Sequence, residues 1–311
     1  MLKKLFYILK PIILRKLQLY LRRKLILSNL QKYKDIWPIL KGSEKKPDFF
    51  SGWPDNKQFA FVLTHDVEHK RGYDRVLKLM EVEKNLGFIS SFNFVPERDY
   101  IVKQELLNEL RINGFDYGVH GLYHDGKLFS NEQEFLKRAE KINFYLKEWN
   151  TKGFRAPAMH HNLDWIGALN IEYDLSTFDT DPFEPQPDGV GTIFPFWVEN
   201  KRNKNGGYLE LPYTLPQDFT PFVLMKEKSA KIWIDKLDWI TAHNGMVLVN
   251  VHPDYIDFES SGKNYEEFDV KIYTELLEYV KNKYEGKYWN ALPSEVARFW
   301  KNLFFSKSQN I

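Results

Sequence analysis

The 311-residue sequence contains no cysteine. A disulfide framework, a thiolate metal site and a cysteine nucleophile are therefore excluded, and any metal ion must be held by histidine and carboxylate side chains. The sequence also lacks a run of about 20 apolar residues, so no transmembrane helix is predicted. The formal net charge is only +2 and no helix-turn-helix or RNA-binding signature is present, so nucleic acid is not an expected partner.

Acidic residues are absent from the first 34 positions, which hold ten Lys and Arg residues, whereas the rest of the chain carries 34 basic and 42 acidic residues. Lys10 and Pro11 interrupt the apolar residues of this segment and no small-residue cleavage site follows, so a signal peptide is not predicted. Two alternatives stay open for residues 1–34. In the first, they lie on an anionic membrane surface, which would place a cytoplasmic protein at the inner membrane face. In the second, they pack on the body of the protein as an amphipathic helix.

Apolar runs typical of strands alternate with helical patterns along most of the chain. Strands are predicted at 59–64, 88–95, 115–120, 153–157, 173–178, 208–213 and 246–252. Helices are predicted at 72–86, 101–112, 131–149, 163–170, 227–243 and 267–284. This alternation predicts an α/β fold with parallel strands, and about seven such strands suit a distorted (β/α) barrel. The Gly- and Pro-rich stretch 179–221 interrupts the pattern and is expected to form long loops.

The predicted organisation has four parts. A basic amphipathic segment covers residues 1–40, a polar connector 41–57, the barrel domain 58–302 and a tail 303–311. Because loops at the carboxyl ends of parallel strands build the active sites of such folds, chemistry is expected in the third part.

The strongest local motif is "VHGLYHD", in which His120 and His124 stand four residues apart directly after a predicted strand. On a helical turn this spacing places both imidazoles on one face, which suits two ligands of a Zn²⁺-like ion. The stretch "FAFVLTHDVEHK" adds Asp66 and Glu68 at the end of another strand. Two histidines and one carboxylate with an open fourth position form a known catalytic zinc arrangement, in which bound water has a pKa near ~7.

Two further strand ends add complementary side chains. "GFRAP" presents Arg155, which is permanently charged and can hold a carboxylate through a bidentate contact. "VNVHPD" presents His252, whose imidazole can supply a proton to a leaving group near pH 7. Together with the metal ligands, these groups predict metal-assisted hydrolysis of an amide or ester.

The order "THDVE", "HGLYH", "RAP", "VHP" resembles that of the metal-dependent polysaccharide deacetylases, over roughly residues 58 to 302. The resemblance implies a hydrolase on a distorted (β/α) barrel that removes acetyl groups from an N-acetylated saccharide, in bacterial surface-polysaccharide or cell-wall metabolism. It implies Asp66 as general base, Arg155 as the residue that positions it and His252 as general acid. It also implies His120 and His124 as ligands of a divalent metal, zinc first, with cobalt, nickel and manganese as alternatives.

The third metal ligand departs from the family's pattern. Many members have two adjacent aspartates, whereas Val67 follows Asp66 here. Other members use an Asp-x-Asp spacing, so the resemblance implies Glu68 as the third ligand, with one more methylene of reach. The chain is in this sense a divergent "HDVE" variant.

Several assignments stay open in the sequence. Asp174, Asp179 or Asp181 could orient His252, His65 is expected to line the site, and the expected rim histidines are His69, His160 and His161. Two alternative functions also remain. One is hydrolysis of a small cyclic amide or ureide on the same barrel, and the other is glycan binding without catalysis.

Overall fold

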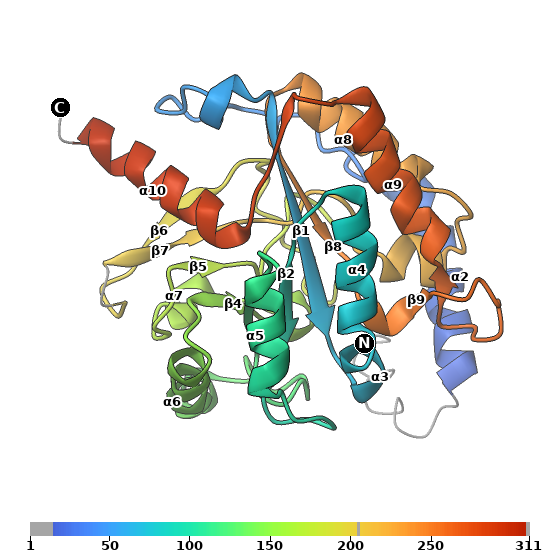
Figure 1. Ribbon diagram of the computed structural model, residues 1–311, viewed down its shortest axis with the longest axis horizontal. Helices are drawn as coiled ribbons and strands as arrows, with labels where there is room; N and C mark the ends of the chain where they lie inside the picture. The colour runs from blue at the N-terminus through green and yellow to red at the C-terminus, as the bar shows by residue number, and fades with distance from the viewer. Residues whose placement is uncertain (1–14, 204–205, 309–311) are drawn as a thin grey trace.

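The computed structural model describes residues 15–203 and 206–308, so the first 14 positions of the basic N-terminal segment lie outside the described residues. A nine-stranded sheet forms the centre of the molecule, in the order β11-β1-β2-β3-β4-β5-β7-β6, with β8 on the other side of β1 (Figure 1). All its ladders are parallel except that between β6 and β7. The strands are β1 (Phe59–Val67), β2 (Ser91–Phe94), β3 (Asp116–His120), β4 (Gly153–Arg155), β5 (Tyr173–Asp174), β6 (Phe196–Glu199), β7 (Gly207–Glu210), β8 (Met246–Asn250) and β11 (Tyr288–Asn290).

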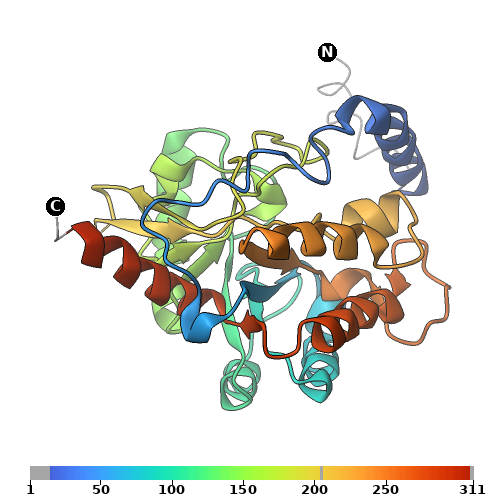
Figure 2. The same cartoon turned by 90° about the horizontal axis from the view of Figure 1, so that it is seen from above.

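Helices flank this sheet, and several of the longer ones join successive strands as crossovers (Figures 1 and 2). They are α3 (Lys70–Tyr73), α4 (Val76–Leu86), α5 (Gln104–Ile112), α6 (Glu132–Glu148), α7 (Leu163–Ile166), α8 (Lys231–Ala242), α9 (Val270–Lys283) and α10 (Pro293–Ser308). The N-terminal helix α2 (Arg15–Tyr33) stands at the margin of the molecule. Short helical turns occur at η1 (Pro54–Asn56), η2 (Pro157–Met159), η3 (Phe219–Leu224) and η4 (Pro253–Tyr255), and β9 (Ile256–Asp257) pairs with β10 (Phe268–Asp269). Among the described residues, no helix combines the length and apolarity needed to cross a bilayer.

The sheet is buried on both faces, which explains the continuous apolar runs in its strands. All nine residues of β1 are buried, and Phe59, Phe61 and Leu63 belong to the main hydrophobic core. Each such side chain contributes about 1.5–3 kcal/mol through burial. The sheet curls, and the backbone N–H groups of Thr214 and Leu215 donate to Leu248 O of β8 at 3.0 and 3.2 Å. An irregular segment rather than a strand therefore links the two sides of the incomplete barrel.

The predicted α/β barrel is confirmed, and each of the seven predicted strands is present. Two strands of the described sheet were not predicted, and neither was the separate pair β9 and β10. β6 lies in the stretch expected to be loop, where its pairing with β7 stabilises it, and β11 is only three residues long. Both strands form because they pair with a neighbouring strand, and neither has a clear alternation of apolar and polar residues that the sequence could reveal. The division into four parts stays a prediction, although Phe50 and Trp53 of the connector pack against Trp300.

Candidate metal centre and active site

The carboxyl ends of β1, β3, β4 and β8 meet at one edge of the sheet and bring the predicted site residues together. Side chains alternate along β1, so Thr64 and Asp66 face the site and Glu68 follows on the same side. His65 points to the opposite face, as described below. The sequence-predicted cluster therefore exists in space, although 54 residues separate Asp66 from His120.

Three of these residues form a group that could hold a metal ion. One ligand atom each from Glu68, His120 and His124 lies within 4.8 Å of the other two. His124 Nε2 lies 2.9 Å from Glu68 Oε1, and within residues 15–203 and 206–308 the buried His120 Nε2 has no hydrogen-bond partner. An unpaired buried nitrogen is costly, so its position beside a carboxylate and a second imidazole fits a bound cation.

The charge states also fit metal binding. Burial lowers the pKa of the His120 imidazole to about 4 although the Asp66 carboxylate opposes this, so the ring is neutral and can offer a lone pair at pH 7. Burial alone would raise the pKa of the Glu68 carboxyl, but His124 and Tyr255 lower it well below its usual range. The donor set is that of a divalent cation with nitrogen and oxygen ligands.

The loop after β3 places the two histidines differently from the prediction. Residues 121–124 are not helical, so the argument from a helical turn was wrong. Gly121 has φ +63° and a Cβ there would lie 2.4 Å from Pro157, while His124 itself has φ +53°. Arg98 fixes this left-handed turn by donating to Tyr123 O at 2.9 Å and His124 O at 3.0 Å. A tight loop thus brings the imidazole centroids to 5.1 Å.

Glu68 is held from two sides. Tyr255 donates its hydroxyl hydrogen bond to Glu68 Oε2 at 2.6 Å, which leaves Oε1 facing His124. The Asp254 carboxylate accepts from the backbone N–H groups of Glu68, His69 and Gly72 at 2.9–3.1 Å. A Cβ at Gly72 would lie 2.1 Å from Asp254 Oδ2, so only glycine permits this approach.

Asp66 lies beside the metal group and is fixed by three donors. Asn93 Nδ2 and Arg155 Nη1 donate to Oδ1 at 3.0 and 3.2 Å, and Asn250 Nδ2 donates to Oδ2 at 2.8 Å. Arg155 touches the carboxylate through one nitrogen only, so the predicted bidentate contact was wrong. Its Nη1 also donates to Asn250 Oδ1 at 2.6 Å, and its Nε donates to the Leu175 carbonyl at 2.9 Å.

The surroundings keep Asp66 ionised. Burial alone would raise the pKa of this carboxyl, which is only 2% exposed. Arg155 and the imidazoles of His120 and His252 outweigh burial and hold the pKa well below its usual range. Asp66 Oδ2 lies 4.0 Å from His120 Nε2 and 3.9 Å from His252 Nε2, so one carboxylate oxygen faces both groups.

His252 is oriented by a residue that the sequence did not indicate. Its Nδ1 donates to Asp218 Oδ1 at 2.7 Å, and its backbone N–H donates to Asp218 Oδ2 at the same distance. Burial alone would lower the pKa of the His252 imidazole, but Asp218, Glu68 and Asp66 raise it to about 10. His252 is therefore protonated at neutral pH, with Nε2 directed at Asp66.

The three candidates offered for that orienting role were wrong. Asp174 accepts from Ser176 at 2.6 Å, Asp179 pairs with Lys236 at 2.7 Å, and Asp181 accepts from Tyr213 at 3.2 Å. Among the described residues, none of these carboxylates contacts His252, because they lie at the end of β5 or in the loop after it, whereas Asp218 lies in the segment that runs beside β8.

The expectation that His65 lines the site was also wrong. It is fully buried between β1 and the covering helices, where Nε2 lies 2.8 Å from Glu83 Oε1 and Nδ1 lies 2.9 Å from Val251 O. Tyr273 and Ser90 also donate to the Glu83 carboxylate. The alternation of β1 could have indicated this, because a residue next to Asp66 must face the other side.

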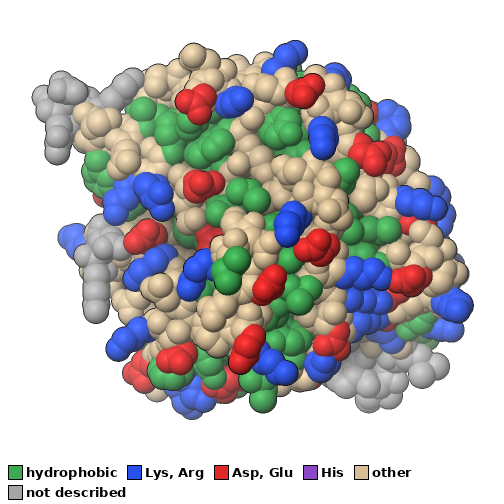
Figure 3. Space-filling view, viewed as in Figure 1, with side chains coloured by type: hydrophobic (Ala, Val, Ile, Leu, Met, Phe, Trp, Pro, Cys, Tyr) green, Lys and Arg blue, Asp and Glu red, His purple; other side chains and the backbone are tan. Residues whose placement is uncertain are grey.

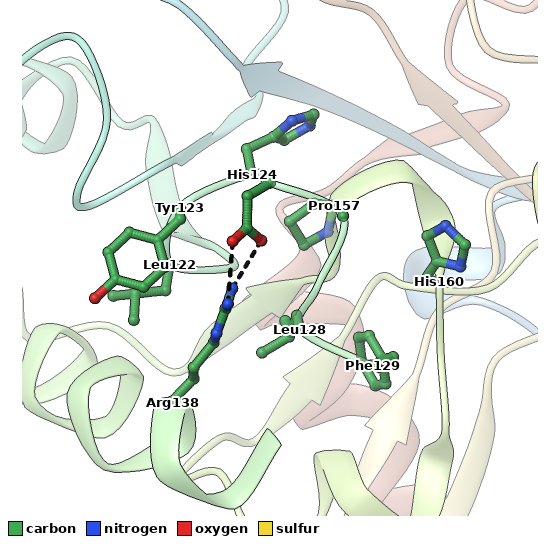
Figure 4. A pocket seen from close by; sticks show the side chains of 10 residues that line it. Leu122, Tyr123, His124, Leu128, Phe129, Arg138, Pro157 and His160 are labelled. Atoms are coloured by element: carbon green, nitrogen blue, oxygen red, sulfur yellow. Dashed lines mark hydrogen bonds and ion pairs between the residues drawn. The ribbon is translucent and has the colours of Figure 1, made fainter. Parts of the chain in front are cut away.

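The other histidines lie outside the metal group. His69 is partly exposed 3.3 Å from Asp99, and His161 Nδ1 lies 2.9 Å from Met159 O. His160 lines a small pocket with Phe129 and Pro157 beside the loop that carries His124 (Figure 4). Arg138 holds Asp125 through two contacts of 2.7 and 3.0 Å at this pocket, while the His124 ring points away from it.

Comparison with known proteins gives a fold but no sequence relative. No protein-family model matches the sequence, and no curated protein matches it. The structure solved as "putative polysaccharide deacetylase from Mycobacterium smegmatis" is 18% identical, aligns with 80% of this chain and 92% of that chain, and gives a TM-score of 0.57. The peptidoglycan deacetylase PdaC from Bacillus subtilis is 13% identical over 83% of this chain and 98% of that chain, with a TM-score of 0.43. A family 4 acetyl xylan esterase from Clostridium thermocellum, solved with cobalt, is 12% identical over 77% and 91%, with a TM-score of 0.42. The chain has the fold of the polysaccharide deacetylases.

Proposed function

We propose that the protein is a metal-dependent hydrolase that removes acetyl groups from an N-acetylated saccharide, as a divergent member of the polysaccharide deacetylases in which Glu68 supplies the third metal ligand. One observation carries this proposal. An ionised carboxylate, Asp66, and a protonated imidazole, His252, lie 3.9 Å apart beside the group formed by Glu68, His120 and His124. A base and an acid beside a metal group form a set that suits amide hydrolysis.

The proposed roles follow from the contacts. A divalent cation on the three ligands would polarise the acetyl carbonyl and acidify water. Asp66 Oδ2 accepts the proton of the attacking water, while Asn93, Asn250 and Arg155 hold the carboxylate in place. His252 Nε2 donates a proton to the departing amine nitrogen, and Asp218 stabilises the imidazolium and fixes the ring.

The finer assignments belong to the same proposal. Zinc is the expected metal because the ligands are two imidazoles and one carboxylate, with cobalt, nickel and manganese as alternatives. The protein is expected in the cytoplasm, peripheral at the inner membrane face through residues 1–34, in bacterial surface-polysaccharide or cell-wall metabolism. Residues 58–302 are expected to form the catalytic domain.

The test uses the purified full-length protein with zinc and after EDTA treatment. Acetate release from N-acetylglucosamine oligosaccharides is expected only in the presence of metal. Metal analysis is expected to show one bound ion, lost in His120→Ala and retained in the matched control His243→Ala, whose ring packs against Trp239 at the end of α8. Absence of release from any acetylated saccharide by the metal-loaded protein would contradict the proposal. Hydrolysis of cyclic amides or ureides in a second substrate panel would support the small-molecule alternative instead. Metal binding without hydrolysis of saccharides or of this second panel would favour glycan binding without catalysis.

A further inference from the structure

Helix α2 has two apolar faces, and within the described part of the chain only one of them is buried against the body of the protein. Leu19 and Ile26 are 7% and 5% exposed and form a small core with Leu224 of η3. Phe183 and Phe219 pack against the same core. This inner face is enough to dock α2 on the body, as an amphipathic helix requires.

The outer face of α2 carries a second set of apolar side chains. Leu17, Tyr20, Leu21, Leu25 and Leu27 are 41–56% exposed. They are five of the thirteen large hydrophobic side chains that are exposed in residues 15–203 and 206–308. Leu17, Leu21 and Leu25 follow one another at four-residue spacing and so form a ridge along the helix. A concentration of this kind on one helix marks an interaction surface.

The charges on α2 indicate what the surface contacts. Residues 15–33 contain six basic and no acidic side chains, and Lys16, Arg23, Lys24 and Lys32 are exposed. Long cationic side chains can extend from an apolar face to the level of lipid headgroups. Helix α2 lies at the far right-hand margin of the view in Figure 1 (Figures 1 and 2), whereas on the near face drawn in Figure 3 basic and acidic side chains are interspersed. A second copy of this helix would bring like charges together, whereas an anionic lipid surface is complementary.

The packed face of α2 leads directly to the metal group. The Arg22 guanidinium lies 5.1 Å from the centre of the Phe219 ring, whose centroid is 4.9 Å from that of Tyr255. Tyr255 in turn donates to Glu68, the candidate ligand. Arg15 pairs with Glu266 at 2.9 Å and anchors the start of the helix. Two aromatic rings thus separate the candidate lipid-facing helix from the metal site.

We propose that the outer face of α2 docks on an anionic lipid bilayer, and that the site acts on an acetylated saccharide joined to a lipid anchor. Docking through α2 brings the metal group close to the membrane surface, where the sugar of such a molecule is found. The substrate class rests on the proposed deacetylase function, whereas the docking does not.

Docking is tested with the full-length protein and two kinds of vesicle. One is phosphatidylcholine alone, and the other contains about a third phosphatidylglycerol. Co-sedimentation is expected only with the anionic vesicles and is expected to weaken in high salt. The variant Leu17→Gln/Leu21→Gln/Leu25→Gln is expected to bind at least about tenfold more weakly, because glutamine keeps the helix propensity and removes the apolar ridge. The control Ile101→Gln/Ile112→Gln changes two side chains that are each 81% exposed elsewhere, and it should bind as the wild type.

Three results would overturn the docking. One is absence of sedimentation with anionic vesicles, and the second is unchanged binding by the triple-leucine variant. The third is a lower melting temperature or a lost dimer in that variant, which would show that the leucines pack within the chain or against a second copy.

The substrate class is tested by comparing two acetylated substrates. The wild type and the triple-leucine variant should release acetate equally from a soluble N-acetylglucosamine oligosaccharide. On a synthetic N-acetylglucosaminyl lipid in anionic vesicles, the variant should be at least about fivefold slower than the wild type. Equal rates on the vesicle substrate would overturn the substrate class while leaving deacetylation intact. Vesicle binding without acetate release from either substrate would overturn the proposed function and leave the docking intact.

Discussion

Two groups of buried carboxylates in this protein have opposite acidities. Asp66, at the end of β1, has a pKa held well below the usual range because Arg155, His120 and His252 outweigh burial. In the second group, near β5 and β7, burial and the neighbouring carboxyl raise the pKa of Glu210 well above the usual range. Glu210 is fully buried with Asp174, and its neutral donors are the backbone N–H and hydroxyl of Thr177. The charge of the neighbours, and not burial alone, separates a base from a neutral acid.

The first prediction removes the charge that defines the Asp66 group. Asp66→Asn is expected to lower kcat by about 10³-fold, because the amide cannot accept the proton of the attacking water. Metal analysis should still find the ion, since Glu68, His120 and His124 are unchanged. Asp181→Asn is the matched control, as Asp181 is 1% exposed but contacts Tyr213 rather than the metal group. A similar loss in both variants would contradict the assignment of Asp66 as the base.

The second prediction tests the acid opposite Asp66. Asp218→Asn is expected to lower kcat by about 10- to 100-fold. Asp218 raises the pKa of His252, so its removal lowers that pKa from about 10, and the imidazolium loses its proton at a lower pH. The alkaline limb of the kcat profile should therefore move to lower pH. An unchanged limb would mean that His252 does not supply the proton.

The third prediction concerns the carboxylate that joins the metal group. Tyr255→Phe removes the hydrogen bond to Glu68 Oε2 and is expected to weaken metal affinity by about 10-fold. Competition with a chromogenic chelator measures this directly. Tyr279→Phe loses a hydrogen bond of 2.8 Å to Asp238, between α9 and α8, and should leave metal affinity unchanged.

The fourth prediction concerns Glu210 of the second group, where a substitution should change stability and have the smallest effect on activity. The Glu210 carboxyl stays protonated in the folded state, whereas in the unfolded chain it loses its proton above a pH of about 4.3. The free energy of unfolding therefore falls as the pH rises beyond that value. Glu210→Gln should remove this loss and raise the free energy of unfolding by about 1–3 kcal/mol at pH 8, with little change near pH 4. Denaturant unfolding at both pH values measures it, with exposed Glu172→Gln as control. A variant less stable than wild type at pH 8 would show that Glu210 is ionised in the fold.

The sequence contained most of the fold because parallel strands buried on both faces leave long apolar runs, and helices separate them. It also predicted the meeting of Asp66, Glu68, His120 and His252, since each follows a strand and strand ends share one edge. Asp218 was not predictable in this way, because it lies in an irregular segment whose position depends on contacts with β8. Asn250 left a signal that strand alternation could have found, as it precedes His252 by two residues in an otherwise apolar strand.

The hydrogen bond from Tyr255 to Glu68 also bears on metal selectivity. It occupies one carboxylate oxygen, so Glu68 has a single oxygen for an ion. Calcium takes six to eight oxygen ligands and often binds a carboxylate through both oxygens, whereas zinc accepts four ligands in a tetrahedron. We therefore expect this centre to discriminate against calcium, because Glu68 offers one carboxylate oxygen instead of two.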